Sequence, residues 1–201
     1  MIAIIDYGVG NLFSLSSSLK YIGAETKVTG EAEDIRAADR IILPGVGAFE
    51  DAAKKLYDTG LVDTIFEEVD AGKPMLGICL GMQLLFDRSF EYGVHKGLGL
   101  IHGDIVSMEG RVGDLKIPQI GWNDLDIKAP DDPLFKYAHS GDYVYFVHGF
   151  FAPPGDYTTA TVNYGTEITA TVRNGNVCGT QFHPEKSGEA GLDILRGFCR
   201  L

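Results

Sequence analysis

A cysteine stands where a buried strand is followed at once by an apolar helix. Cys79 lies in the run Gly77-Ile-Cys-Leu-Gly81, which has the Gly-x-nucleophile-x-Gly pattern of a nucleophile elbow, with sulfur in place of a hydroxyl. Glycine on both flanks permits a turn so tight that a Cβ would collide with neighbouring backbone. At a helix N-terminus the dipole favours the thiolate, the form that attacks a carbonyl carbon. The alternative is a structural cysteine, because free cysteine is among the most buried residue types.

A histidine and a glutamate near the C-terminus favour a nucleophilic role for Cys79 over a structural one. Residues 177–182 read as a strand, and Pro184 ends this strand because it cannot donate to a ladder. His183 and Glu185 then lie at the edge of the sheet where α/β proteins build their sites, and both side chains can turn the same way. A thiol nucleophile needs an imidazole to move its proton, and the imidazole needs a carboxylate to hold its tautomer. Considered without Cys79, His183 would be taken for an ordinary loop histidine. The elbow pattern around Cys79 makes this alternative less favourable.

A glycine-rich loop supplies the third candidate group. Residues 41–43 form an apolar strand that leads into Pro44-Gly-Val-Gly47, where two glycines let backbone N–H groups face a pocket. With the N–H of Leu80, which follows the nucleophile, this loop could form an oxyanion hole for a tetrahedral intermediate. The alternatives are an ordinary βα turn or a phosphate cradle. Neither glycine-rich phosphate-binding pattern is present, so the phosphate alternative is weak.

The first part of the chain alternates strands and helices. Residues 1–6 form an apolar run typical of a strand buried on both faces of a sheet. Asn11 can cap the helix that follows, in which leucines recur at helical spacing. Short strands are expected at residues 26–29 and 40–43, and one helix at residues 56–69. This alternation predicts a doubly wound, mostly parallel sheet flanked by helices.

The second part of the chain is rich in strands. From residue 103 onward, apolar runs with strand character follow one another, and Asn174-Gly175 marks a hairpin turn between the last two. A final helix is expected from about residue 187. No repeat, low-complexity tract or linker divides the chain, so we expect an α/β fold in a single domain over residues 1–201, with a β-rich C-terminal half.

Composition limits the partners and the compartment. The chain has 201 residues, of which 45% are hydrophobic, enough for one substantial core. The net charge of −11, from 17 basic against 28 acidic residues, argues against nucleic acid and anionic membranes as partners. Three cysteines suggest no disulfide framework, which favours the cytoplasm. We expect no signal peptide, because no basic segment precedes the first apolar run, and no membrane span, because no apolar run approaches the roughly 20 residues that a span needs. We also expect no cofactor and no metal, since the four histidines besides His183 lack ligand spacing.

The three motifs, in this order and spacing, resemble the class I (triad) glutamine amidotransferases, over essentially the whole chain. Within that class, further segments resemble the glutaminase subunits of imidazole glycerol phosphate synthases; they are residues 6–11, 44–49, 81–86, 120–123, 144–148 and 183–187. The resemblance implies a flavodoxin-like sandwich and hydrolysis of glutamine to glutamate and ammonia, without a cofactor. It also implies a heterodimer in which ammonia passes to a cyclase subunit, a (β/α)8 barrel. That subunit forms imidazole glycerol phosphate and aminoimidazole carboxamide ribotide in histidine biosynthesis.

The resemblance assigns roles to single residues. Cys79 would be the nucleophile, His183 the general base and acid, and Glu185 the orienting carboxylate. The oxyanion hole would consist of the N–H groups of Val46, Gly47 and Leu80. The residues implied at the substrate are Gly45, Gln83, Glu91, Gly149 and Phe150. Members of the family often carry Thr-Tyr at the last two positions, and the contact there is made by the main chain. The residues implied at the partner interface are Trp122, Asn123 and Lys186.

The sequence leaves two alternatives to this assignment open. The glutaminase of pyridoxal phosphate synthase shares the implied fold, triad and barrel partner, and the segments around Pro44, Trp122 and Val144 favour the histidine pathway over it. A non-catalytic module on the same scaffold is the second alternative, although such relatives usually lack the cysteine or the histidine. We hypothesise that the partner controls glutaminase activity by rotating one peptide, so that Val46 presents or withdraws its N–H.

Overall fold

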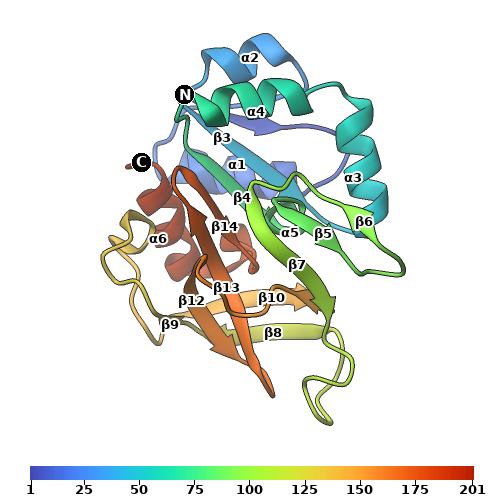
Figure 1. The fold of residues 1–201 in the computed structure, drawn as a ribbon. Helices are drawn as coiled ribbons and strands as arrows, with labels where there is room; N and C mark the ends of the chain where they lie inside the picture. The colour runs from blue at the N-terminus through green and yellow to red at the C-terminus, as the bar shows by residue number, and fades with distance from the viewer.

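A computed structural model describes all residues from Met1 to Leu201 (Figure 1). The helices and strands of its first half are β1 Ile2–Ile5, α1 Leu12–Tyr21, β2 Thr26–Thr29, α2 Ala32–Ala37, β3 Arg40–Gly45, α3 Phe49–Asp58, α4 Val62–Asp70, β4 Met75–Cys79, α5 Leu80–Leu84, β5 Phe86–Ser89 and β6 His95–Lys96. Those of its second half are β7 Ile101–Ser107, β8 Gln119–Asp124, β9 Asp126–Ile127, η1 Pro133–Phe135, β10 Tyr143–His148, β11 Phe150–Phe151, β12 Thr158–Asn163, β13 Glu167–Asn174, β14 Val177–Thr180, η2 Pro184–Lys186 and α6 Gly188–Phe198.

The central sheet is parallel on one side and antiparallel on the other. Its eight strands run in the order β2-β1-β3-β4-β14-β13-β12-β9. The first five pair in parallel, and β13, β12 and β9 add antiparallel strands beyond β14. A two-stranded ribbon of β8 and β10 and a smaller sheet of β11, β7, β5 and β6 complete the β-rich part. The predicted α/β fold, with a mostly parallel sheet and a β-rich C-terminal half, is confirmed.

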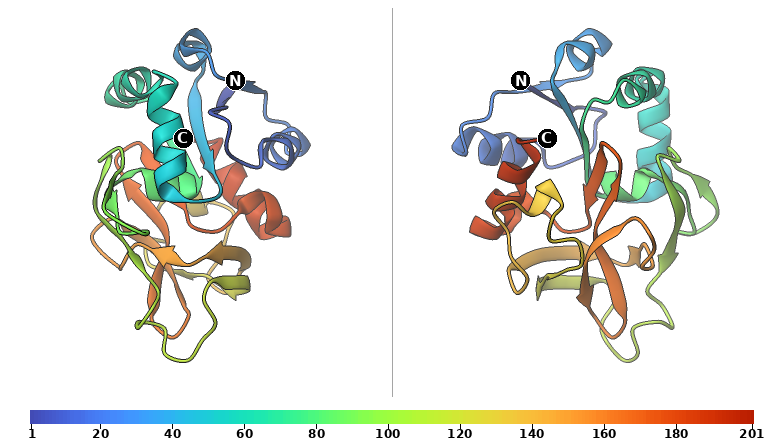
Figure 2. Two further views of the ribbon diagram at one scale, coloured as in Figure 1. Left: turned by 90° about the vertical axis from the view of Figure 1, so that its right-hand side faces the viewer. Right: turned by 60° about the vertical axis from the view of Figure 1, so that its left-hand side comes forward.

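Helices cover both faces of this sheet, as strand β1 illustrates. Its residues are fully buried, with Ala3 and Ile5 in one apolar core and Ile2 and Ile4 in the other. The first core includes residues of α2, α3 and α4, and the second includes residues of α1 and α6. Figure 2 shows α1 and α6 together on one side of the sheet, with α3 and α4 on the other. A strand buried on both faces needs apolar side chains at every position, which explains the continuous run at the start of the chain.

Three predictions about elements were wrong. The single helix expected at residues 56–69 is two helices, because Gly60 adopts a left-handed φ of +72° after α3 and the hydroxyl of Thr59 accepts from the N–H of Leu61. Asn11 precedes α1 but makes no side-chain cap. The strand expected over residues 177–182 ends at Thr180, and Pro184 begins a 3-10 turn. The hairpin after Asn174 is confirmed, since Asn174 pairs with Val177 across a two-residue loop.

Candidate active site

Three neighbouring parallel strands bring the predicted groups to one edge of the sheet. Strand β4 lies between β3 and β14, and in the register of these strands Gly45 is opposite Cys79 and Ile78 is opposite Thr180. The glycine-rich loop, the cysteine and the segment with His183 therefore leave the sheet side by side. They border a cavity of about 160 Å³, lined by Val46, Gly47, Cys79, Leu80, Gln83, Glu91, Val147, His148, Gly149, Phe150 and His183.

The turn at Cys79 is a close-packed elbow. Cys79 has a φ of +55° and a ψ of −112°, a conformation that is unfavourable for a residue with a side chain. A Cβ on Gly81 would lie 1.9 Å from the carbonyl oxygen of Leu43, and one on Gly77 would lie 2.7 Å from that of Gly81. The predicted need for glycine on both flanks is confirmed. Helix α5 has only five residues, so one turn of N–H groups faces the thiol.

His183 and Glu185 form a buried pair beside the cysteine. Nδ1 of His183 lies 2.8 Å from Oε1 of Glu185, and both side chains are 2% exposed. The backbone of His183 is held by Tyr145, whose carbonyl accepts from its N–H, and by the hydroxyl of Ser187. Burial opposes a positive charge on His183, but the hydrogen bonds and charges of Cys79 and Glu185 outweigh burial and raise its pKa to about 9. The arrangement therefore favours a positively charged imidazole beside the sulfur of Cys79.

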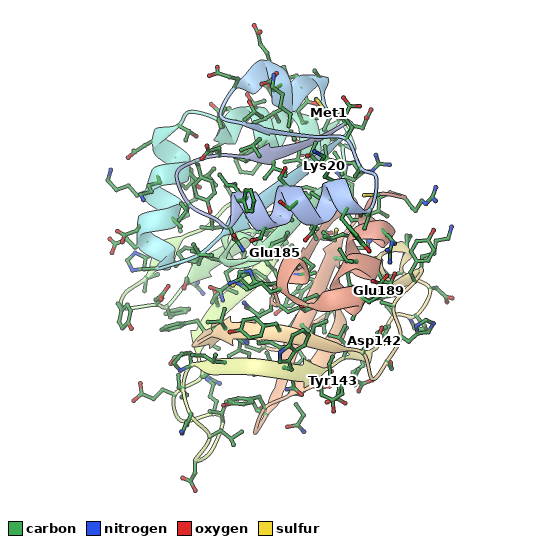
Figure 3. All side chains as sticks on the ribbon, turned by 180° about the vertical axis from the view of Figure 1, so that it is seen from behind. Met1, Lys20, Asp142, Tyr143, Glu185 and Glu189 are labelled. Carbon is green, nitrogen blue, oxygen red and sulfur yellow. The ribbon has the colours of Figure 1, made fainter.

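Asn11 does not cap α1 because its amide faces the glutamate. Its Nδ2 donates to Oε1 of Glu185 at 3.4 Å, over 174 positions of sequence. Oε2 of Glu185 is buried without a protein partner, and Glu185 lines a small cavity together with Asn11, Leu15 and Pro44. Figure 3 shows Glu185 between α1 and the strands β8 and β10. The start of α1 thus supports the pair of His183 and Glu185 rather than its own helix.

Residues with free backbone donors line the same cavity as Cys79. The N–H groups of Val46 and Gly47 donate to no protein acceptor, and Leu80 begins α5, so its N–H has no acceptor within the helix. Gly47 has a left-handed φ of +91°, with nothing within 4 Å of where a Cβ would lie, and Val46 is 36% exposed. These donors line the cavity and could hold a developing oxyanion. Their assignment to that role stays a prediction.

Four of the five residues expected at the substrate line the cavity. Oε2 of Glu91 accepts from the N–H of Phe49 at 2.7 Å, which leaves its other oxygen free. Both N–H bonds of Gln83 are used, one on the carbonyl of Phe150 at 3.0 Å and one on Oε1 of Gln181 at 2.9 Å. Gly149 keeps a free N–H, because only its carbonyl is engaged, by the N–H of Met108.

Gly45 is the exception among them. It packs against the elbow, where a Cβ would lie 2.6 Å from the N–H nitrogen of Gly81. It lines the small cavity beside Glu185 rather than the one beside Cys79. The position therefore has a packing reason to be glycine, and its role in substrate binding stays a prediction.

Two buried polar residues of the site, Gln181 and His148, were given no role in the site from the sequence. Nε2 of Gln181 donates to the sulfur of Cys79 at 3.8 Å, and Nδ1 of His148 lies 2.9 Å from the carbonyl of Phe150. Burial is the main reason that the pKa of His148 is lowered to about 4, so this ring is neutral at physiological pH. A signal existed for Gln181, which is two residues before His183 at the end of a strand and so shares a face with it. For His148 the pattern gave no comparable signal.

The residues expected at a partner interface lie on two faces of the β8–β10 ribbon. Trp122 is 55% exposed and its ring is 6.0 Å from that of Tyr145, over which the ammonium of Lys186 lies at 5.9 Å. Asn123 points to the other face, where its amide donates to the carbonyl of Asn163. The structure thus groups Trp122 and Lys186 but not Asn123, and the interface role of all three stays a prediction.

Comparison with known proteins agrees with this geometry. The sequence profile of the family "Glutamine amidotransferase class-I" matches residues 3–200. A protein of Caldanaerobacter subterraneus subsp. tengcongensis is 49% identical, with 100% of this chain and 98% of the relative covered. One of Methanosarcina mazei is 50% identical with the same coverage. Both are named "Imidazole glycerol phosphate synthase subunit HisH".

The fold is shared with a solved structure. The structure of PurLQS from Thermotoga maritima is 23% identical and covers 99% of this chain and 97% of its own. Its TM-score of 0.79 shows that the fold is shared.

None of the helices has the length and apolarity that crossing a membrane would need.

Proposed function

This chain belongs to the class-I glutamine amidotransferase family, and we propose that it is the glutaminase subunit of an imidazole glycerol phosphate synthase. It would hydrolyse glutamine to glutamate and ammonia and pass the ammonia to a cyclase subunit. The observation that carries this proposal is a strained thiol and a buried imidazole at one cavity, with a buried carboxylate behind the imidazole, in a chain similar over its full length to subunits of that name.

The first step is attack of the Cys79 thiolate on the side-chain amide carbon of glutamine. A carbon–sulfur bond forms and the carbonyl electron pair moves to oxygen, where the N–H of Leu80 and one from Val46 or Gly47 would stabilise the charge. The free donors of the loop and the first N–H of α5 support this role. His183, with its raised pKa, holds the proton that the leaving nitrogen requires.

The second step is hydrolysis of the thioester. When His183 has protonated the departing ammonia it is neutral, and it can then take a proton from water that attacks the thioester carbon. Glutamate leaves, and the thiolate and imidazolium are restored. Glu185, 2.8 Å from Nδ1, would hold the imidazole so that Nε2 is the nitrogen that faces the reaction.

The amino-acid end of glutamine would meet the remaining free polar atoms of the cavity. Oε1 of Glu91 and Oε1 of Gln83 are left as acceptors for the substrate ammonium, because their other polar atoms are engaged. The N–H of Gly149 is left as a donor for the carboxylate. This division of donors and acceptors matches a zwitterionic amino acid.

The exposed apolar face of the β8–β10 ribbon is the surface that we propose for the cyclase. Ile120 and Trp122 are 62% and 55% exposed and lie on the same face as Tyr145 and Val147. Val147 also lines the cavity, and its carbonyl lies 4.0 Å from the sulfur of Cys79. A barrel seated here would cover both the ribbon and the cavity, so ammonia need not enter bulk solvent. The partner could also set the Val46 peptide of the nearby loop.

The function is tested by imidazole glycerol phosphate formation with purified cyclase, using glutamine or free ammonia as the nitrogen source. We expect the wild-type chain to support both reactions and Cys79→Ala to support only the ammonia-dependent one. If wild type with cyclase consumes no glutamine, the proposal is wrong. Activation by the pyridoxal phosphate synthase barrel instead would support the second candidate, which the names of the full-length relatives do not favour. Equal glutamine turnover by the isolated chain and the complex would contradict control by the partner.

The interface is tested by Trp122→Ala. Because Trp122 is largely exposed in the free chain, we expect the variant to fold normally and to bind the cyclase about 30-fold more weakly, the effect of losing roughly 2 kcal/mol. Isothermal titration gives the dissociation constant. Tyr21→Ala is the matched control, since Tyr21 is 75% exposed but ends α1 away from the ribbon. An unchanged affinity for Trp122→Ala would remove the ribbon face from the interface. We expect the complex to form in the cytoplasm, where Cys79 stays reduced.

A further inference from the structure

Gln181 lies between the nucleophile and the wall of the substrate cavity. Its side chain is fully buried, at 0% exposure, just after strand β14. Nε2 donates to the sulfur of Cys79 at 3.8 Å, and Oε1 accepts from Nε2 of Gln83 at 2.9 Å. One amide thus contacts both the attacking atom and a residue that we propose contacts the substrate.

A main-chain carbonyl determines which end of the Gln181 amide is the oxygen and which is the nitrogen. The carbonyl of Phe150 can only accept, so the N–H₂ group of Gln83 must face it, at 3.0 Å. The second hydrogen of the same group then meets Gln181, which must present its oxygen there. The N–H₂ group of Gln181 is consequently turned toward Cys79. Rotating either amide by half a turn would bring two oxygen atoms, or two N–H groups, against each other.

The only protein acceptor within hydrogen-bond distance of this N–H₂ group is the sulfur. A buried amide that serves the fold alone normally finds an oxygen, because an unpaired N–H costs free energy. A neutral thiol is a weak hydrogen-bond acceptor, whereas a thiolate is a strong one. The hydrogen bond from Gln181 is therefore strong only when Cys79 is charged. His183 faces the same sulfur and favours the same charge state.

We propose that Gln181 is a positioning residue for glutamine hydrolysis: its N–H holds the Cys79 thiolate and its oxygen holds Gln83 against the Phe150 backbone. This proposal rests on the proposed function. It predicts two separable consequences of losing the amide. The thiolate becomes less populated, which lowers the reactivity of Cys79 at low pH. Gln83 becomes free to rotate, which weakens binding of the amino-acid end of the substrate.

Two variants and a neighbouring control separate these consequences from loss of stability. Gln181→Met has a similar length without hydrogen bonds. Gln181→Glu keeps an oxygen for Gln83 but places a carboxylate oxygen at the sulfur. The control is Thr180→Val, because Thr180 is also fully buried and its hydroxyl makes a comparable hydrogen bond, to the carbonyl of Phe182 at 3.0 Å, away from the cavity.

The first measurement is the rate of Cys79 alkylation by iodoacetamide against pH, resolved by peptide mass spectrometry in the isolated full chain. Cys178 is an internal reference, since burial raises its pKa to about 12. We expect the midpoint for Cys79 to rise by about half to one pH unit in Gln181→Met, and by more in Gln181→Glu because of like-charge repulsion. Thr180→Val should keep the wild-type midpoint.

The second measurement is the kcat and KM for glutamine in complex with the cyclase. We expect Gln181→Met to lower kcat roughly tenfold and to raise KM several-fold, because both the nucleophile and Gln83 are displaced. Gln181→Glu should change KM less, since it keeps the contact with Gln83.

The outcomes are distinct. A folded Gln181→Met with the wild-type alkylation profile overturns the proposal and leaves Gln181 a structural residue. If that variant does not fold, Gln181→Glu decides by the same readout. Alkylation needs no glutamine, so a wild-type complex that hydrolyses no glutamine would overturn the proposed function, while a shifted profile would still support the contact of Gln181 with Cys79.

Discussion

The elbow that carries Cys79 and the loop that follows β3 lie next to each other but differ in how they are held. At the elbow, added Cβ atoms on Gly45, Gly77 and Gly81 would all approach backbone to within 2.7 Å. In the loop, a Cβ on Gly47 would meet nothing within 4 Å, and Val46 is 36% exposed. One side of the cavity is therefore fixed by packing, and the other has room to move.

This difference suggests where control can act at least cost to stability. Moving the nucleophile would disturb the packing between β3, β4 and α5, whereas the N–H groups of the loop donate to no protein acceptor and have open space beside Gly47. A single oxyanion donor typically contributes on the order of 10²–10³ in rate. A partner that sets the Val46 peptide could thus change turnover strongly while the triad stays in place.

Gly81→Ala is the most severe way to test the packed side. The new Cβ would lie 1.9 Å from the carbonyl oxygen of Leu43, and neither backbone segment can yield as a flexible side chain would. We expect the free energy of unfolding to fall by about 3–5 kcal/mol, or the chain not to fold. Urea unfolding followed by circular dichroism measures this. A wild-type midpoint would mean that the elbow is not close-packed, and the contrast with the loop would fail.

Glu185→Gln tests the buried pair without changing its size. Because an amide does not fix the imidazole tautomer or balance its charge, we expect kcat for glutamine to fall by on the order of 10²–10⁴. The ammonia-dependent reaction of the complex should remain, which separates lost chemistry from lost assembly. Glu189→Gln is the control, since Glu189 pairs with Arg196 in an exposed ion pair. Wild-type glutamine turnover in Glu185→Gln would exclude Glu185 from the mechanism.

The same variant has a pH signature in stability. The pKa of His183 is raised from 6.5 to about 9 in the folded chain, so the folded state holds this proton more tightly than the unfolded state. The resulting stabilisation is complete below about pH 6.5 and is lost as the pH rises through 9. Urea midpoints at several pH values should fall over this window in wild type and fall less in Glu185→Gln. Parallel curves would contradict the contribution of Glu185 to this pKa.

Gly47→Ala tests the open side. Its φ of +91° disfavours any side chain, but space is free, so we expect a loss of only about 1–2 kcal/mol in unfolding free energy. Glutamine turnover should fall more than stability implies, by up to about 10²-fold, because the loop donors shift. Gly141→Ala is a matched control with a φ of +92° and open space. Equal turnover in the two variants would show that the loop geometry does not affect the reaction.

The contrast between elbow and loop also marks what the sequence could reveal. Gly77, Cys79 and Gly81 are close in sequence, and steric exclusion acts between near neighbours, so the elbow could be recognised from its pattern. His183 and Glu185 are separated only by Pro184, and this closeness in sequence allowed them to be predicted as a pair. The parallel sheet followed from the alternation of strands and helices. Each of these predictions depends on local spacing.

What the sequence did not reveal depends on contacts between distant segments. Asn11 looked like a helix cap, and its partner Glu185 is 174 residues away. Gln181 precedes His183 by two residues, but it was passed over because the sequence does not show that it meets Cys79 and Gln83, which are 102 and 98 positions away. The break at Gly60 was missed because one glycine inside an apolar pattern is compatible with both a continuous helix and two helices. Short strands such as β6 and β9 carry too few residues for a period to appear.

Tyr7→Phe tests the hydrogen bond at the base of the loop, where the loop joins the packed elbow. The buried hydroxyl of Tyr7 donates to the carbonyl of Pro44 at 2.7 Å, at the base of the loop, and burial followed by the charge of Cys79 raises its pKa, so it stays protonated. Its removal should cost about 1 kcal/mol of stability and lower glutamine turnover a few-fold by loosening the loop. Tyr157→Phe is the control, because its hydroxyl donates to the carbonyl of Pro153 at 2.6 Å, away from the site. If both variants lose stability but turnover is the same in each, Pro44 needs no anchor, and the loop is set by the partner alone.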